Sequence, residues 1–83
     1  MRVTVRYVAG LREALGTGSE QRDTQATSVG ALRDELIALG GAYADSLAHG
    51  RAVRLALNQV VVDADAALAE GAEVAFFPPV TGG

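Results

Sequence analysis

Strict alternation of charged and apolar residues marks the first segment of the chain. Val3, Val5 and Tyr7 occupy every second position of residues 2–8, and a period of two is typical of a strand with one buried face. Residues 20–24 are polar, so we expect them to form an edge strand, where charge resists aggregation. The N-terminal segment therefore predicts two strands, with Val3, Val5 and Tyr7 on one face of the sheet.

A helical period appears further along the chain. After a short helical turn predicted over residues 11–15, apolar residues recur at spacings of three and four over residues 29–39, the pattern of a helix with one buried stripe. The preceding Thr-Ser pair supplies an N-cap and the following Gly-Gly pair ends the helix. Gly30 in the first turn costs about 0.5–1 kcal/mol relative to alanine. We expect a second, shorter helix over residues 42–48.

Short apolar runs predict the remaining strands. Residues 53–57 and 60–62 are separated by Asn58-Gln59, which suits a tight hairpin, although the pair lacks the glycine of the strongest turn signal. Residues 66–68 predict one helical turn. Residues 73–77, Glu-Val-Ala-Phe-Phe, are rich in aromatic and β-branched residues, and we expect them to form the last strand.

This order of elements predicts an α+β domain over residues 1–77, with one main helix packed across a mixed sheet of four or five strands. One helix and a short companion cannot cover both sheet faces, so the other face must be polar or an interface. We expect Phe76 and Phe77 to point to opposite faces, with Phe77 on the open one. The three consecutive valines of residues 60–62 cannot all point into one core, and their surplus also favours an interface.

The composition excludes several kinds of chemistry. The chain has no cysteine and only one histidine, so neither a thiol nucleophile nor a metal site is expected. Its net charge is −3, which disfavours binding to nucleic acid or to an anionic membrane. Residues 1–6 do not resemble a signal sequence, and no apolar run approaches the length of a membrane span. We therefore expect a cytoplasmic protein without a bound cofactor.

All seven positive charges are arginines, so the chain has no lysine. It cannot be linked to itself through an isopeptide bond on a side-chain amine. Polar contacts with a partner must therefore use arginine or carboxylate side chains.

The last six residues, from Pro78 to Gly83, form the most informative segment. Pro78 and Pro79 favour an extended, stiff backbone, while Gly82 and Gly83 can enter a narrow channel because they have no side chains. Six extended residues reach about 20 Å. We expect residues 78–83 to form a tail that carries a terminal carboxylate into the active site of another protein. An inert terminus is the alternative.

Residues 70–83 closely resemble the C-terminus of the small subunit of molybdopterin synthase, from a family of sulfur carriers with the ubiquitin-like β-grasp fold. The resemblance extends back through residues 55–59 and to the first strand with Leu11-Arg12-Glu13. A terminal Gly-Gly is shared by β-grasp sulfur carriers and ubiquitin-like modifiers. The preceding Phe-Pro-Pro-Val distinguishes the molybdopterin branch.

The resemblance implies a chemical role for the Gly83 carboxylate. An ATP-dependent adenylyltransferase, similar to ubiquitin-activating enzymes, joins this carboxylate to AMP. A sulfur donor protein then displaces AMP and leaves a thiocarboxylate, which donates sulfur to a cyclic pterin precursor inside the large catalytic subunit. The resemblance also implies a heterotetramer in which the catalytic acids and bases belong to the large subunit. ATP is used by the partner enzyme, so the chain itself is a non-catalytic sulfur donor.

The same resemblance assigns roles to individual residues. Gly83 carries the reactive carbon and Gly82 keeps the inserted segment narrow. A second group of residues is expected either to enter the large subunit with the tail or to form the docking face. Its members are Phe77, Pro78, Pro79, Val80, Thr81, Val61 and Tyr7. Phe77, Val61 and Tyr7 are expected to form an apolar docking face for the large subunit.

Three other functions remain open at this point. The chain could serve as a sulfur carrier for thiamine or cysteine synthesis, although Phe-Pro-Pro-Val argues against this. It could be a protein modifier whose Gly83 forms isopeptide bonds with lysines of target proteins. It could also be an interaction domain with an inert tail, in which case deleting Gly83 would change nothing.

Overall fold

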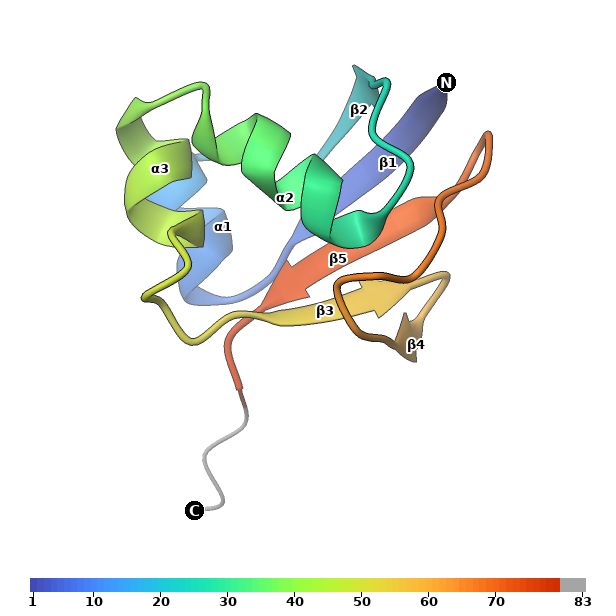
Figure 1. Ribbon diagram of the computed structural model, residues 1–83. Coiled ribbons are helices and arrows are strands. Elements are labelled where there is room, and N and C mark those ends of the chain that lie inside the picture. The colour runs from blue at the N-terminus through green and yellow to red at the C-terminus, as the bar shows by residue number, and fades with distance from the viewer. Residues whose placement is uncertain (80–83) are drawn as a thin grey trace.

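The computed structural model describes residues 1–79 and shows a mixed sheet with helices on one of its faces (Figure 1). Along the chain the elements are β1 (Arg2–Tyr7), α1 (Gly10–Leu15), β2 (Ser19–Asp23), α2 (Val29–Ile37), α3 (Gly41–Leu47), β3 (Arg54–Leu57), β4 (Val60–Val61) and β5 (Glu73–Phe77). The five strands lie in the order β2-β1-β5-β3-β4. The predicted α+β architecture with a mixed sheet is confirmed.

The central strands of the sheet come from the two ends of the described chain. β1 pairs with β5 in parallel, and the other pairs are antiparallel. β2 is an edge strand, as its polar sequence predicts, and β4 forms the other edge. β5 therefore runs through the middle of the molecule before the chain continues into Pro78.

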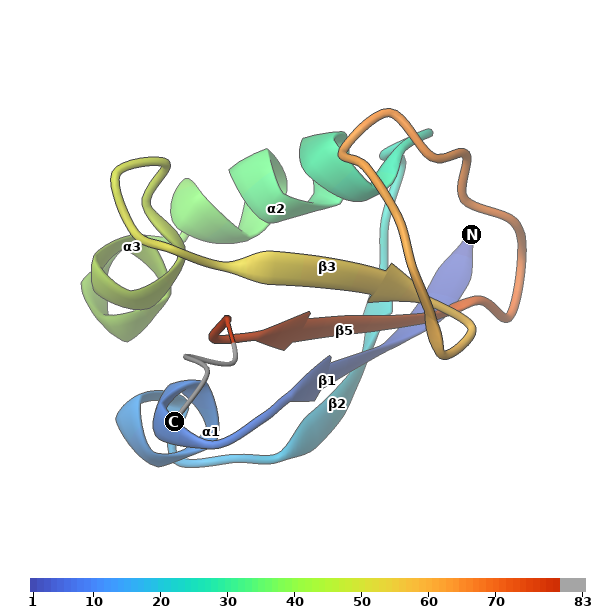
Figure 2. The same cartoon turned by 90° about the horizontal axis from the view of Figure 1, so that it is seen from below.

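Helix α2 lies across the sheet (Figures 1 and 2), and it supplies most of the core residues that come from helices. Ser28 is its N-cap, and the Ser28 hydroxyl accepts a hydrogen bond of 3.1 Å from the Ala31 amide. Val29, Leu32 and Leu36 are fully buried. Leu39 is 50% exposed, because the helix ends at Ile37. The prediction of a helix with its buried stripe up to residue 39 was therefore two residues too long.

The core lies between α2 and the sheet face that carries alternate residues of the two central strands. These residues are Val3, Val5 and Tyr7 of β1 with Val74 and Phe76 of β5. The rings of Tyr7 and Phe76 stack with their centroids 6.2 Å apart. Each of these five side chains is at most 2% exposed, so the period of two in both strands is a period of burial.

Gly30 allows the first turn of α2 to touch the segment that follows β4. Its amide donates a hydrogen bond of 2.7 Å to the Ala64 carbonyl, and a Cβ at this position would lie 2.9 Å from that same oxygen. Glycine therefore stands in the helix because of this close contact, despite its low helix propensity.

The helical turn predicted over residues 66–68 is wrong. Ala67 instead pairs with Ser28 in an isolated antiparallel bridge, and the Leu68 amide donates to the Thr27 carbonyl at 3.0 Å. The Ala66 carbonyl accepts from the Val29 amide at 3.0 Å. Extended backbone in this segment satisfies an amide of α2 that has no partner within the helix, which a helical turn would not do.

The β3–β4 hairpin turns through two residues with left-handed backbone. Asn58 has φ 50° and Gln59 has φ 70°, the combination of a type I′ turn, which fits the twist of a two-residue hairpin. The Asn58 side chain accepts a hydrogen bond of 2.9 Å from the Glu73 amide. The predicted hairpin is confirmed, and Asn58 ties its turn to the start of β5.

Arg33 joins α2 to the end of α3. Its side chain is buried and donates to the carbonyl oxygens of Leu47 at 2.7 Å and Ala48 at 2.9 Å. These carbonyls have no partners within a helix that ends at Leu47. Arg33 thereby positions the chain that leads from α3 to β3.

Candidate functional site

The end of β5 is the root of the predicted tail. Figures 1 and 2 show β5 ending at the side of the molecule where α1 and α3 lie. Pro78 and Pro79, which follow directly, are half-buried. The other predicted tail residues, Val80, Thr81, Gly82 and Gly83, lie outside the described residues.

The sheet face opposite α2 is not covered by a helix, and we call it the open face. Strand register places Arg6, Ala75, Ala56 and Val61 in one row across β1, β5, β3 and β4. Val61 is 57% exposed. This row leads from a charged residue through two small side chains to an exposed valine, so the middle of the row is apolar.

Phe77 lies on the open face beside the tail root. It pairs with Arg54 of β3 and is half-buried, whereas the neighbouring Phe76 is fully buried. Because adjacent residues of a strand point to opposite faces, the expectation that Phe77, and not Phe76, lies on the open face is confirmed.

Tyr7 is not part of the open face, and its predicted place in the docking surface is wrong. It is 2% exposed and stacks on Phe76. Its hydroxyl donates a hydrogen bond of 2.9 Å to Glu20. The physical reason is the alternation of β1, which gives Tyr7 the same orientation as the buried Val3 and Val5.

Val8 is the residue that the sequence interpretation missed. It is 45% exposed, and its amide donates to the Phe76 carbonyl at 3.2 Å, which places it beside the end of β5. Continued alternation after Tyr7 directs the Val8 side chain to the open face. The same alternation would have identified Val8 from sequence, because it separates Val8 from the buried set.

A polar cluster around Glu20 fastens α3 to the edge of the sheet. The Glu20 carboxylate accepts hydrogen bonds from Tyr7 at 2.9 Å, Tyr43 at 2.6 Å and Arg22 at 3.0 Å. Tyr43 belongs to α3, whereas Glu20 and Arg22 belong to β2. The cluster therefore joins α3 to β1 and β2.

The pKa values of this cluster follow from burial and from its hydrogen bonds. Burial opposes ionisation of Glu20, but the hydrogen bonds from Tyr43, Tyr7 and Arg22 together lower its pKa. Burial, followed by the hydrogen bond to Glu20, raises the pKa of Tyr7 well above its ordinary value. Glu20 is thus a carboxylate and Tyr7 a neutral phenol at neutral pH, each in the form that its hydrogen bond requires.

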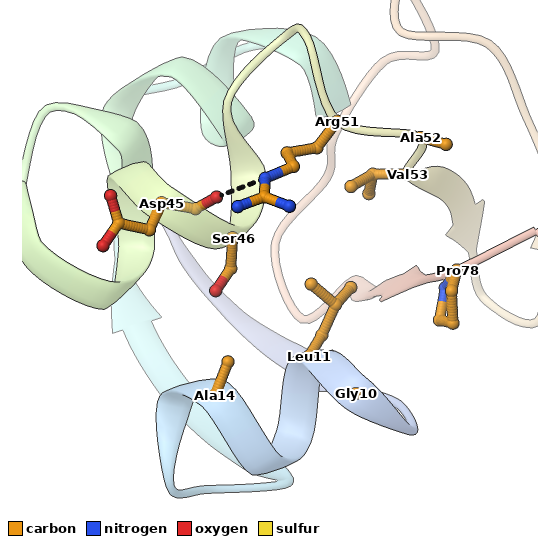
Figure 3. A pocket seen from close by; sticks show the side chains of 9 residues that line it. All are labelled: Gly10, Leu11, Ala14, Asp45, Ser46, Arg51, Ala52, Val53 and Pro78. Carbon is orange, nitrogen blue, oxygen red and sulfur yellow. Dashed lines mark hydrogen bonds between the residues drawn. The ribbon is translucent and has the colours of Figure 1, made fainter.

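A hollow of about 430 Å³ lies between α1, α3 and the start of β3 (Figure 3). Its lining consists of Gly10, Leu11, Ala14, Asp45, Ser46, Arg51, Ala52, Val53 and Pro78. Arg51 donates a hydrogen bond of 2.9 Å to the Asp45 carbonyl oxygen at its rim. Among the described lining residues, Ser46 is the only hydroxyl and no histidine or cysteine stands beside it, so this hollow does not contain a nucleophile with its base.

Within residues 1–79, the part of the chain that the structure describes, two kinds of feature are absent. No group of three or more histidine, cysteine or carboxylate side chains is arranged to hold a metal ion. No helix in that range has the length and apolar character needed to cross a membrane.

Comparison with known proteins identifies the family. The model of the ThiS family matches residues 5–83. The chain belongs to the ThiS family. The molybdopterin synthase sulfur carrier subunit of Escherichia coli strain K12 is 40% identical over 81 residues, which cover 98% of this chain and 99% of that protein.

Solved structures of similar proteins confirm the β-grasp fold of this ThiS-family chain. SAMP1 from Haloferax volcanii superposes with a TM-score of 0.79 and is 26% identical, with 100% of both chains covered. A chain from the complex of subunits 1 and 2 of molybdopterin-converting factor of Helicobacter pylori 26695 gives a TM-score of 0.71 at 24% identity, again with 100% of both chains covered. At that identity the Helicobacter structure supports the fold alone.

Proposed function

We propose that this protein is the sulfur carrier of molybdopterin synthase and that the Gly83 carboxylate is the group that carries sulfur. The observation that supports this best is the similarity to the Escherichia coli carrier, 40% identical over 81 residues. It agrees with the Phe-Pro-Pro-Val-Thr-Gly-Gly ending and with the position of Phe77 and Pro78 at the end of a central strand.

The proposed chemistry begins with activation of the carboxylate. A carboxylate is a poor electrophile because its charge repels nucleophiles and oxide is a poor leaving group. An ATP-dependent adenylyltransferase joins the Gly83 carboxylate to AMP and releases pyrophosphate. The terminal sulfur of a donor persulfide attacks the carbonyl carbon and AMP leaves; cleavage of the sulfur–sulfur bond by a second thiol of the donor system then releases the thiocarboxylate. The chain has no cysteine, so it has no thiol that could carry the sulfur instead.

The second stage takes place in the large catalytic subunit. The open face docks through Val8, Phe77 and Val61, and the tail enters the active site, where it donates sulfur to a cyclic pterin precursor. Enclosure raises the effective concentration of the sulfur atom and excludes the water that would hydrolyse it. Catalytic acids and bases belong to the large subunit, and we place the assembly in the cytoplasm as a heterotetramer with two copies of each chain.

The structure supports this division of roles through the position of the tail root. β5 lies between β1 and β3, and its last residues are held by pairing with both neighbours. The tail therefore begins at a rigid point of the fold. Two prolines follow directly, which reduces the conformational entropy lost when the tail is ordered in a partner.

The test is the intact mass of the protein after reaction with ATP, the adenylyltransferase and a sulfur donor. We expect a mass gain equal to sulfur replacing one oxygen, localised to the Gly82-Gly83 peptide. A variant lacking Gly83 should keep the fold but gain no sulfur and support no molybdopterin formation. Sulfur transfer by the truncated variant would show that the terminal carboxylate is not the carrier.

The same reaction distinguishes the other functions. If the thiocarboxylate forms but the purified large subunit does not use it, a carrier for thiamine or cysteine synthesis is favoured. Adducts of higher mass on lysines of other proteins would indicate a modifier. An intact tail that gains no mass with a competent activating enzyme would indicate an interaction domain.

A further inference from the structure

The charged side chains of the open face are mostly paired with each other. Arg2 of β1 forms an ion pair of 3.0 Å with Asp23 of β2. Arg6 of β1 lies 3.6 Å from Glu73 of β5. These two pairs lie across the β1–β2 and β1–β5 junctions, so this half of the open face carries no net charge.

Arg54 stands apart from these pairs. It is exposed, it begins β3 and it lies opposite Phe77, so it is adjacent to the tail root. Within the described residues its guanidinium forms no ion pair and no hydrogen bond. Among the strand residues of the open face, three arginines and two carboxylates give a charge of +1, whereas the whole chain has a net charge of −3.

An arginine in this position has a consequence for docking. If a partner covers Phe77 it also removes water from the neighbouring guanidinium, and a desolvated charge without a counter-charge opposes binding. A carboxylate on the partner removes this penalty, because a guanidinium binds a carboxylate through two parallel hydrogen bonds. The partner surface that fits this face is therefore apolar with an acidic residue opposite Arg54.

We propose that Arg54 forms an ion pair with a carboxylate of the large catalytic subunit and that this pair fixes the orientation in which the sheet docks. This inference rests on the function proposed above. The apolar row on the open face consists of Ala75 and Ala56, which have small side chains, with Val61 at its edge, and none of these side chains can make a directional polar contact. A two-pronged ion pair next to Phe77 supplies the missing direction and aims the tail.

The experiment measures binding of the full-length chain to the purified large subunit by calorimetry at low and high salt. We expect Arg54→Gln to raise Kd by about tenfold or more, with a larger effect for Arg54→Glu. Arg54→Lys should recover only part of the affinity, because an ammonium group cannot form the two-pronged contact. The melting temperatures of these variants should equal that of the wild type, since the Arg54 side chain makes no ion pair or hydrogen bond with another described residue.

Arg2→Gln is the matched control. Arg2 carries the same charge and lies on the same face, but it is at the start of β1, away from Phe77, and it is paired with Asp23. Its Kd should remain within about twofold of the wild-type value. Unchanged binding of Arg54→Glu would overturn this inference and leave the sulfur-carrier function standing. An equal loss in Arg2→Gln would overturn it as well, since the effect would then be one of net charge. Absence of wild-type binding would overturn both this inference and the proposed acceptor.

Discussion

Replacing Gly30 with alanine tests whether the contact between α2 and the segment after β4 controls stability. Helix propensity alone predicts that alanine is better here by about 0.5–1 kcal/mol. The structure predicts the opposite sign. A Cβ at Gly30 would lie 2.9 Å from both the Cβ and the carbonyl oxygen of Ala64, closer than nonbonded atoms normally approach.

The magnitude follows from what must move. Relieving the contact requires Ala64 to shift away from α2, which stretches the 2.7 Å hydrogen bond from the Gly30 amide. Overpacking of this kind costs about 1–3 kcal/mol, and a weakened hydrogen bond adds about 1 kcal/mol. After the gain of about 0.5–1 kcal/mol in helix propensity is subtracted, we expect a net destabilisation of about 1–3.5 kcal/mol, and each kcal/mol lowers Tm by roughly 4–8 °C.

The assay is urea unfolding followed by far-ultraviolet circular dichroism, with Gly10→Ala as the matched control. Gly10 is also in the first turn of a helix, but a Cβ there would meet no atom within 4 Å. We expect this control to be neutral or stabilising by up to about 0.5 kcal/mol. A Gly30→Ala variant as stable as the wild type would refute the steric argument and show that the segment around Ala64 yields at little cost.

Three further predictions concern the turn, the Glu20 cluster and the two phenylalanines. Gln59→Gly should raise the free energy of unfolding by about 0.5–1 kcal/mol, because Gln59 has φ 70° and glycine tolerates this backbone without strain. A urea unfolding free energy equal to that of the wild type would contradict the left-handed backbone assigned to this turn. The pKa of Glu20 is lowered in the fold, so its contribution to the free energy of unfolding is present above about pH 4.3 and is lost as the pH falls through the folded-state pKa. Glu20→Gln should be less stable than the wild type at pH 7, and its free energy of unfolding should fall less steeply as the pH is lowered. Equal stability of the two proteins at pH 7 would contradict the role given to the cluster. Phe76→Ala should cost about 3–5 kcal/mol of stability, whereas Phe77→Ala should mainly weaken binding of the large subunit by about 2 kcal/mol; equal melting temperatures of the two variants would contradict their placement.

Local patterns were sufficient to predict most of the fold. The period of two in β1 and the helical period in α2 both survive as periods of burial, because each element has one face on the core. The order of the elements then restricts the sheet topology. The segment around Ala67 was not predictable in this way, since its conformation is determined by the amides of α2, which are distant in sequence.

The candidate site was predictable to a different degree at different residues. Phe77 follows from strand alternation, and Val61 lies on the open face as the surplus of valines indicated. Tyr7 was placed in the docking face although the alternation of β1 puts it on the same face as the core valines, and it is buried in the core. Val8, which the same alternation puts on the open face, was overlooked. The hydrogen bonds from Tyr7 and Tyr43 to Glu20 have no local sequence signal, because three separate elements must first come together.

The position of β5 separates stability from recognition within a single strand. Val74 and Phe76 face the core, and Ala75 and Phe77 face away from it. A change of partner can therefore be made on the open-face positions without repacking the core, and the paired neighbours keep the tail root in place while this happens. Arg54 fits this separation, since it belongs to the recognising side and contributes no described contact to the fold. Affinity for different acceptors should thus vary with residues such as Arg54, Val61 and Phe77, while unfolding free energy should vary with Phe76 and its buried neighbours.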